Sequence, residues 1–211
     1  MKSYIKRKIA ENLRQPKGIF GWFMGSFMNH FNKGIIRYTV EAIPGKDLSC
    51  IVEAGIGSGK ALALCTKRFP KANFYGIDIS KKMLLKAKIR NWKSLRNGRM
   101  KLYYASIDEL PIADQRADIV YTINTIYFWN DPNGVFKEIH RILKNGAYLI
   151  LSFNPKEEMQ KAVYPKDLFT LYSGEEVRIL AEKNKFKVIS TKEFTDRYEK
   201  YLCMILQKTA Y

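Results

Sequence analysis

The sequence EAGIGSG, from Glu53 to Gly59, closes an apolar run that starts at Leu48 and precedes a helical pattern that begins near Lys60. Its three glycines allow a tight turn and let a ligand approach the backbone without interference from a Cβ atom. The helix that follows directs its N-terminal amides toward the same point. The stretch therefore predicts a strand, a ligand-binding turn and a helix, the first unit of a doubly wound α/β sheet.

Two familiar phosphate-binding turns do not match this stretch. A P-loop has the pattern Gly-x4-Gly-Lys-Ser/Thr, and the sequence has Gly59 and Lys60 but alanine at both 54 and 61. It therefore lacks the hydroxyl that binds magnesium in nucleoside triphosphatases. A dinucleotide-binding turn needs its third glycine at position 60, where a lysine stands. The observed spacing is Gly-x-Gly-x-Gly preceded by an acid.

The rest of the chain continues the strand–helix alternation that predicts a parallel sheet. Strands are predicted at 48–54, 73–78, 101–105, 118–124, 147–153, 186–193 and 201–208, and helices at 60–68, 80–90, 132–143 and 173–184. Ser80 is a predicted N-cap, Asn145-Gly146 a predicted helix stop, and Ser173 with Glu176 a capping box. The last two strands are expected to form an antiparallel pair.

Two segments lie outside the alternation. Residues 1–47 are expected to form a helical N-terminal cap within the same domain as 48–211, since Ile5, Ile9 and Leu13 repeat at helical spacing. Residues 154–172 form a long connection after the fifth strand, and we expect it to serve the substrate side.

Five segments in register resemble the motifs of the class I S-adenosylmethionine-dependent methyltransferases. In chain order they are 53–59, 75–80, 108–111, 118–121 and 140–146. The resemblance implies a Rossmann-like fold with a seven-stranded, mostly parallel sheet and an antiparallel last strand. It also implies S-adenosylmethionine as the methyl donor and S-adenosylhomocysteine as the product. Within this class, the chain resembles the ubiquinone/menaquinone-biosynthesis-like (methyltransferase type 11) group, which acts on small molecules.

The resemblance assigns roles to individual residues. Glu53 is expected to act on the methionine moiety and Asp78 to accept hydrogen bonds from the two ribose hydroxyls. Ser106 stands where the family often has the aspartate that accepts the adenine amino group, which weakens the expectation for that contact. The full set of expected cofactor-binding residues is Glu53, Ala54, Gly55, Gly57, Gly59, Asp78, Ile79, Met83, Ser106, Ile107, Thr122 and Asn124.

The sequence leaves the catalytic group and the acceptor open. Methyl transfer is an in-line displacement in which alignment in a dry pocket supplies much of the acceleration, so a strong base is not required. His30, Tyr127 and Trp129 are weak candidates. The aromatic and methionine-rich stretch 18–37 resembles a substrate lid, which favours a small, hydrophobic or aromatic acceptor.

Charge supports competing hypotheses. Lys and Arg number 37 against 20 Asp and Glu, a net charge of +17, and nine basic residues without an acid lie between Lys81 and Lys101. Such a surplus attracts anions. RNA is therefore the alternative substrate, and contact with an anionic membrane is a second interpretation of the charge. The simplest interpretation is a solvated, lysine-rich face. A third class is a binding protein that holds the cofactor without turnover. The oligomeric state stays open.

Composition sets the remaining expectations. Three scattered cysteines and two histidines give no metal-ligand spacing, so no metal site is expected. The apolar run 19–28 is too short to cross a membrane and lacks a cleavage pattern. We therefore expect neither a signal peptide nor a membrane-spanning segment there, and a cytoplasmic protein.

Overall fold

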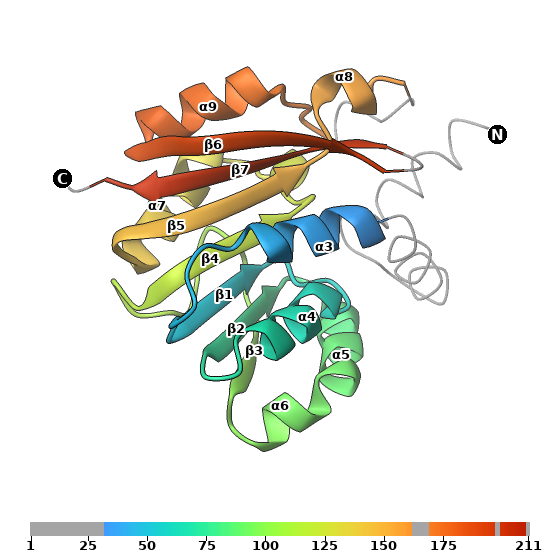
Figure 1. Ribbon diagram of the computed structural model, residues 1–211, viewed down its shortest axis with the longest axis vertical. Coiled ribbons are helices and arrows are strands. Elements are labelled where there is room, and N and C mark those ends of the chain that lie inside the picture. Colours follow the sequence, from blue (N-terminus) through green and yellow to red (C-terminus); the bar gives the residue numbers. More distant parts are fainter. Residues whose placement is uncertain (1–31, 162–168, 197–198, 210–211) are drawn as a thin grey trace.

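The computed structural model describes residues 32–161, 169–196 and 199–209, and their seven strands form one sheet with the order β3-β2-β1-β4-β5-β7-β6 (Figure 1). The strands are β1 (Cys50–Ala54), β2 (Asn73–Asp78), β3 (Met100–Tyr104), β4 (Ala117–Ile123), β5 (Leu143–Phe153), β6 (Phe186–Thr195) and β7 (Lys200–Lys208). Strands β1 to β5 are parallel to one another, and β7 runs antiparallel between β5 and β6. The predicted doubly wound sheet and its antiparallel ending are confirmed.

Helices lie on both sides of the sheet. They are α3 (Lys33–Ala42), α4 (Lys60–Arg68), α5 (Lys81–Arg90), α6 (Trp92–Arg96), α7 (Pro132–Ile142), α8 (Lys156–Met159) and α9 (Gly174–Lys183), with a 3-10 turn η1 at Ile126–Phe128. Apolar residues of α3 and α4 share one core with Ile51 of β1, whereas those of α7 and α9 share the other core with Val52. Because successive residues of β1 supply opposite cores, the strand is apolar up to Glu53, whose carboxylate lies in the pocket described below.

The helix ends show where local sequence signals hold and where they do not. The Ser80 hydroxyl accepts a hydrogen bond from the Met83 amide and caps α5, and the Ser173–Glu176 capping box is complete. Helix α7 ends at Ile142, however, ahead of the predicted stop at Asn145-Gly146. Leu143 already pairs with Ala117 of β4, and Gly146, at φ +73°, lies within β5 near the register shift opposite β4. Strand pairing therefore ends the helix before the glycine does.

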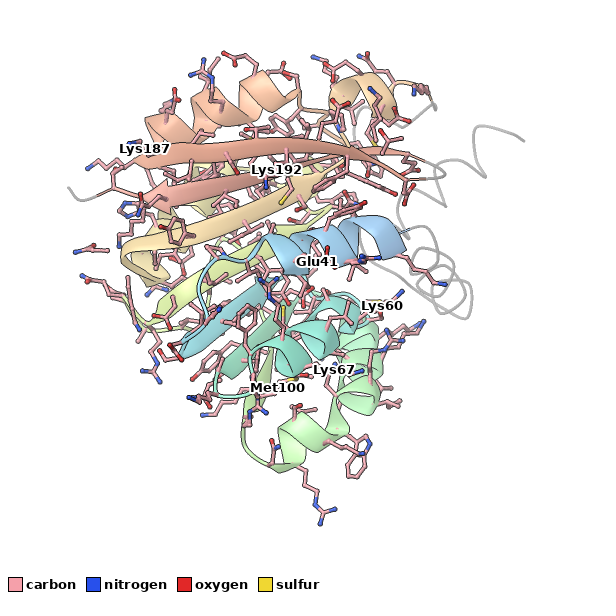
Figure 2. All side chains as sticks on the ribbon, viewed as in Figure 1. Glu41, Lys60, Lys67, Met100, Lys187 and Lys192 are labelled. Carbon is pink, nitrogen blue, oxygen red and sulfur yellow. The ribbon has the colours of Figure 1, made fainter. Side chains whose placement is uncertain are left out.

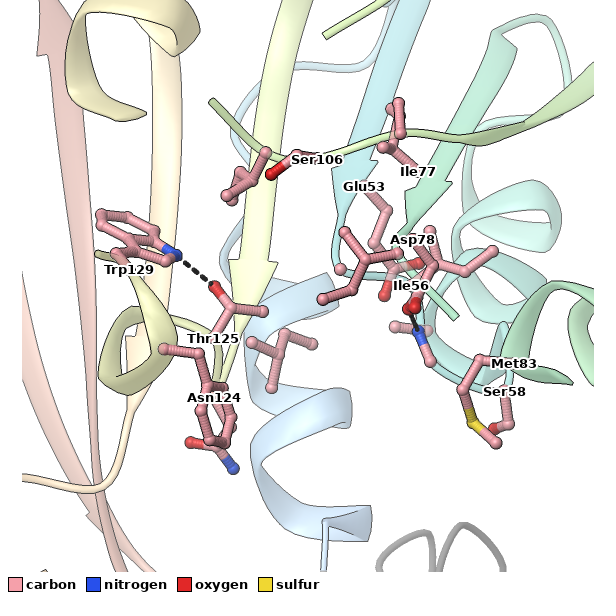
Figure 3. A pocket seen from close by; sticks show the side chains of 18 of the residues that line it. Glu53, Ile56, Ser58, Ile77, Asp78, Met83, Ser106, Asn124, Thr125 and Trp129 are labelled. Carbon is pink, nitrogen blue, oxygen red and sulfur yellow. Dashed lines mark hydrogen bonds between the residues drawn. The ribbon is translucent and has the colours of Figure 1, made fainter. Parts of the chain in front are cut away.

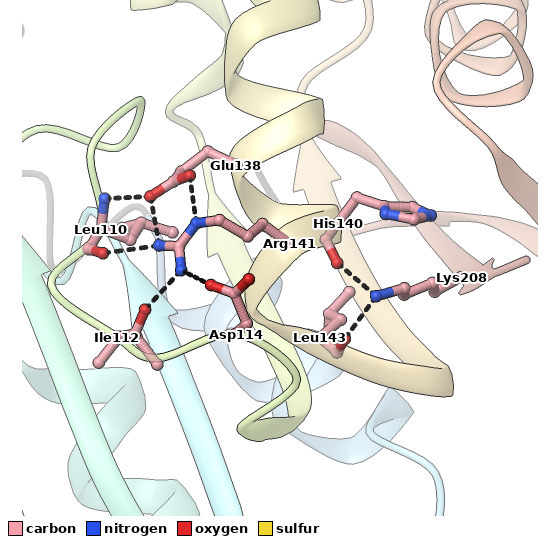
Figure 4. A network of polar contacts seen from close by, with 8 residues as sticks. All are labelled: Leu110, Ile112, Asp114, Glu138, His140, Arg141, Leu143 and Lys208. Carbon is pink, nitrogen blue, oxygen red and sulfur yellow. Dashed lines mark hydrogen bonds and ion pairs between the residues drawn. The ribbon is translucent and has the colours of Figure 1, made fainter. Parts of the chain in front are cut away.

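The connection after β3 is anchored to α7 by a charged network (Figure 4). Glu138 accepts a hydrogen bond from the Leu110 amide at 2.7 Å, and Arg141 donates to the carbonyls of Leu110 and Ile112 and to Asp114. This network fixes the chain directly after residues 105–108, which line the pocket described below. His140 lies nearby but faces the C-terminus, with its Nε2 3.2 Å from the Thr209 carbonyl.

All three cysteines are free and buried. Burial raises the pKa of the Cys50 thiol to about 11 and that of Cys65 to about 12, and it also raises the pKa of Cys203. Within the described residues, no group of three or more His, Cys, Asp or Glu side chains is arranged to hold a metal ion. No helix in this part of the chain is both long and apolar enough to cross a membrane.

The N-terminal segment is described only in part. Its described helix is α3, whose buried residues contact α4, β5 and β7. The predicted helical repeat at Ile5, Ile9 and Leu13 lies outside the described residues, as do the candidate base His30 and Tyr164 of the long connection.

Candidate active site

A pocket lies at the carboxyl ends of β1, β2 and β4, where a doubly wound sheet binds its ligands. Asp78 and Met83 stand on one side of it, and Asn124, Thr125 and Trp129 stand on the other (Figure 3). The start of the N-terminal helical segment also reaches the pocket, through Asn32 and Ile36. The pocket is therefore formed by the central strands together with the N-terminal segment.

The three glycines of the first turn have positive φ angles but different surroundings. Gly55, Gly57 and Gly59 have φ of 79°, 49° and 71°. A Cβ added at Gly55 would clash with Thr125, and one at Gly59 would lie 2.6 Å from the Asn91 amide nitrogen. A Cβ at Gly57 would meet no protein atom within 4 Å, although Gly57 lines the pocket. Gly55 and Gly59 thus allow close packing within the protein, whereas Gly57 leaves space on the ligand side.

Asp78 ends β2 with its carboxylate in the pocket. One oxygen accepts a hydrogen bond from the Gly57 amide and the other from the Ser80 amide, both at 2.8 Å. Burial raises the pKa of Asp78, and the two amide hydrogen bonds oppose that rise. Each carboxylate oxygen has a second lone pair, so the group can still accept a hydrogen bond from each of two neighbouring hydroxyls.

Glu53 is a second carboxylate in the pocket and is only 3% exposed. Its Oε2 accepts a hydrogen bond from the Tyr121 hydroxyl at 2.8 Å. Burial raises the pKa of Glu53 to about 8, and the nearby Asp78 carboxylate adds to the rise. A buried acid of this kind is stabilised in its charged form by a ligand cation.

Lys60 and three residues of the connection after β3 complete this half of the pocket. Lys60 lines it, and burial together with Lys33 and Arg90 lowers the pKa of its ammonium group. From the connection after β3, Ser106, Ile107 and Asp108 also line the pocket. Asp108 brings a carboxylate two residues beyond the serine that replaces the family aspartate.

The other half of the pocket combines apolar and aromatic side chains with the amides of Asn32, Asn124 and Asn130. Phe128 and Trp129 line it, and the Trp129 Nε1 donates a hydrogen bond to the Thr125 hydroxyl at 3.1 Å. Asn124 lines it too, in a left-handed backbone conformation at φ 55°. The described part of the connection 154–172 does not line the pocket; its Phe169 packs against the Phe128 ring with a centroid distance of 4.9 Å.

The structure separates the predicted site residues into two groups. Those that line the pocket are Glu53, Gly55, Gly57, Asp78, Ile79, Met83, Ser106, Ile107, Asn124 and Trp129. Ala54 and Thr122 do not line the pocket. The Thr122 hydroxyl donates a hydrogen bond to the Ala54 carbonyl. Gly59 is the N-cap position of α4. Tyr127 is turned away from the pocket, and its hydroxyl bonds to the backbone of Asn154.

The sequence reasoning did not select several lining residues. They include Asn32, Ile36, Lys60, Asp108 and Thr125. Lys60 follows the glycine turn and Asp108 begins the segment 108–111, so their place next to or within a motif could have indicated them. Asn32 and Ile36 lie within the stretch 18–37 that resembles a lid, but no motif singles them out.

This fold, with a glycine turn and two carboxylates at the ends of its first two strands, defines the Rossmann-like class I methyltransferase architecture. Residues 52–151 match a family model described as a methyltransferase domain. This match and the methyltransferases named below support a class I S-adenosylmethionine-dependent methyltransferase, whose methyl donor is S-adenosylmethionine.

Individual relatives and structures agree with this assignment. The chain is 30% identical over 141 residues to malonyl-[acyl-carrier protein] O-methyltransferase of Marinomonas sp. (strain MWYL1), covering 65% of this chain and 51% of the relative. A chain in the complex of the Haloferax volcanii Trm112 methyltransferase activator with a methyltransferase has a TM-score of 0.75 at 18% identity, covering 88% of this chain and 94% of that one. A SAM-dependent methyltransferase from Aquifex aeolicus has a TM-score of 0.69 at 21% sequence identity, and the match covers 82% of this chain and 88% of that one. These structural similarities show the fold. The chain spans about half the length of the first curated relatives it matches.

Proposed function

We propose that this protein transfers the methyl group of S-adenosylmethionine to a small acceptor with a hydrophobic or aromatic body. The observation that carries the proposal is the division of one pocket into two unlike halves. Glu53, Asp78 and the open space at Gly57 suit the charged and hydroxylated cofactor, whereas Phe128 and Trp129 offer an apolar surface. The malonyl-[acyl-carrier protein] relative adds support, since its name describes O-methylation of an acyl group.

The residues assigned to the cofactor fit its chemistry. Asp78 would accept hydrogen bonds from the ribose hydroxyls, and Glu53 would face the ammonium group of the methionine moiety. Lys60, next to the glycine turn, would attract the carboxylate of that moiety. Ser106 and Asp108 would border the adenine, and Ile79, Met83 and Ile107 would pack against it. In these roles the carboxylates of Asp78 and Glu53 and the ammonium group of Lys60 are charged, because each proposed ligand partner stabilises the charged form.

The proposed step is an in-line displacement. The acceptor atom attacks the methyl carbon, the carbon–sulfur bond breaks, and its electron pair returns to sulfur, which loses its positive charge. Any proton on the acceptor then passes to water. In this proposal the protein contributes chiefly by aligning the two molecules for the displacement.

The N-terminal segment would complete the acceptor half. Asn32 and Ile36 line the pocket, and the Asn124 side-chain amide lies 3.4 Å from the Asn32 side-chain oxygen, at hydrogen-bond distance. We infer that residues 1–47 cover the acceptor as part of the same domain as 48–211. Substrates would then be enclosed between this cap and the segment that follows β4.

Two measurements test the proposal in sequence. Calorimetric titration should show micromolar binding of S-adenosylmethionine and S-adenosylhomocysteine but no comparable binding of NAD or ATP. Mass spectrometry should then detect S-adenosylhomocysteine release with a panel of lipophilic phenols, quinols, fatty acids and malonyl thioesters. Release with RNA alone would replace the proposed acceptor class with the nucleic-acid alternative. Cofactor binding without turnover on any member would favour a binding protein.

A further inference from the structure

Helices α5 and α6 lie beside β3 at one edge of the sheet (Figure 1). They carry exposed apolar side chains. Leu85, Ile89 and Trp92 are 53%, 61% and 51% exposed. Leu85 and Ile89 are four residues apart and so lie on one face of α5, while Met83 and Ala87 form its buried face. Helix α5 therefore has an apolar stripe on its solvent side in addition to the one that packs on the sheet. We call Leu85, Ile89 and Trp92 the exposed stripe.

Basic residues surround the exposed stripe. Lys82, Lys88 and Lys93 are exposed, and the segment from Lys81 to Lys101 contains nine Lys and Arg residues and no acid. Burial, followed by the neighbouring Arg90, lowers the pKa of Lys86. An apolar stripe bordered by lysines is the arrangement of helices that lie in the interface of an anionic bilayer.

The two competing interpretations of this face explain less of it. A solvated lysine face gives no reason for Leu85, Ile89 and Trp92, each more than half exposed, to fall within one short segment. A nucleic-acid surface uses charge and aromatic stacking, which would engage the lysines and Trp92 but leave Leu85 and Ile89 exposed. A bilayer interface accommodates all of them, because aliphatic groups enter the acyl region, tryptophan favours the headgroup level and lysines reach lipid phosphates.

We propose that the face formed by α5 and α6 docks onto an anionic lipid bilayer, with the exposed stripe inserted and the flanking lysines on the headgroups. The cofactor pocket lies close to this face. Met83 of α5 and the preceding Ile79 line the pocket, and Ile79 is itself 38% exposed. Docking would thus bring the pocket near the membrane surface. The proposal holds for any acceptor and does not depend on the proposed function.

Vesicle flotation of the full-length protein tests this docking. One set of vesicles contains phosphatidylcholine alone. The other set contains phosphatidylcholine with about 30% of the anionic lipid phosphatidylglycerol. We expect binding only to the anionic vesicles. Leu85→Ser/Ile89→Ser should weaken it about tenfold through lost apolar burial, and Lys88→Gln/Lys93→Gln about fivefold per lysine. Each variant keeps residues 1–47 unchanged, so the loss reports on α5 and α6.

Matched controls come from the opposite end of the sheet. Ile179→Ser/Ile189→Ser removes two side chains of similar exposure, 53% and 46%, and Lys183→Gln/Lys187→Gln removes two exposed lysines. Figure 2 shows Lys187 far from α6. The controls should bind vesicles as the wild type does, and all variants should retain cofactor binding, which shows that they are folded.

Three results would overturn the proposal. The first is equal binding to neutral and anionic vesicles, and the second is an equal loss in the control variants. The third is a combined result. The variant Leu85→Ser/Ile89→Ser keeps its affinity for vesicles, while the lysine variant binds both vesicles and a single-stranded RNA oligonucleotide more weakly, and to the same extent. That last result would make the face a general polyanion site.

Discussion

The two halves of the pocket are built in different ways. The half proposed for the cofactor comes from residues 53–61, 77–83 and 105–108, and it relies on backbone turns and carboxylates placed by short motifs. The half proposed for the acceptor combines residues 123–135 with Asn32 and Ile36. Both halves are assembled by the fold from different segments, but only the first is marked by recognisable motifs. Substitutions on one side should therefore leave the other largely unaffected.

The largest expected effect is that of Gly57→Val. The new side chain would occupy the ligand space, so affinity for S-adenosylhomocysteine should fall by at least about 100-fold, as calorimetry would show. A valine at positive φ also strains the backbone, by roughly 1–3 kcal/mol. Gly98→Val is the matched control, because Gly98 has φ 76° and no atom near its added Cβ, and it lies outside the pocket lining. Similar affinity losses in both variants would refute the steric role of Gly57.

Asp78→Ala should have the next largest effect. Losing hydrogen bonds to a charged group costs about 1.5–3 kcal/mol, which is roughly 10- to 150-fold in affinity. Because Asp78 also binds the Gly57 and Ser80 amides, part of the loss could come from the turn. Comparing S-adenosylhomocysteine with its 2′-deoxy analogue separates the two effects. The wild type should prefer the natural ligand and the variant should not; a preserved preference would remove Asp78 from the ribose contact.

The third prediction concerns pH. The pKa of Glu53 is about 8 in the folded protein, against an ordinary value of 4.5. The protonated form therefore contributes stability to the ligand-free protein, and this contribution is fully present below pH 4.5. It is lost as the pH rises through about 8. A ligand ammonium group favours the carboxylate instead. Between pH 6 and 8, affinity for S-adenosylmethionine should therefore rise on the order of tenfold, while the melting temperature of the ligand-free protein falls.

Two variants sharpen this test. Glu53→Gln should flatten both pH dependences within the same window. Tyr121→Phe removes the hydroxyl that donates to Glu53 and should move both transitions to higher pH. An affinity in the wild type that does not change with pH would mean that Glu53 does not face the ammonium group.

The smallest effect is expected in the acceptor half. Phe128→Leu should lower kcat/KM for the best member of the acceptor panel several-fold, through the loss of an aromatic surface worth about 1 kcal/mol. Affinity for S-adenosylhomocysteine should stay within about twofold of the wild-type value. Phe169→Leu serves as the control, because Phe169 packs on Phe128 without lining the pocket. A comparable loss of cofactor affinity in Phe128→Leu would show that the two halves are not separable.

The same contrast explains what the sequence could predict. Strand–helix alternation and the turn from Glu53 to Gly59 were sufficient for the fold, because they are local patterns that the sheet preserves. Asp78 could be located because it ends the neighbouring strand. Tyr127 was less accessible to such reasoning: the turn η1 directs it to Asn154, while its neighbours Phe128 and Trp129 line the pocket. Contacts such as Asn32 with Asn124 join residues 92 apart, and no local signal encodes them.

The buried cysteines have a practical consequence for labelling chemistry. Maleimides react with the thiolate, and a thiol with a pKa of about 11, as at Cys50, is ionised in about one molecule in 10,000 at pH 7. All three native thiols are also shielded from reagent by the core. A fluorophore or spin label could therefore be attached through one cysteine introduced at an exposed position, such as Asn97→Cys beside α6. The native cysteines would not need to be replaced first.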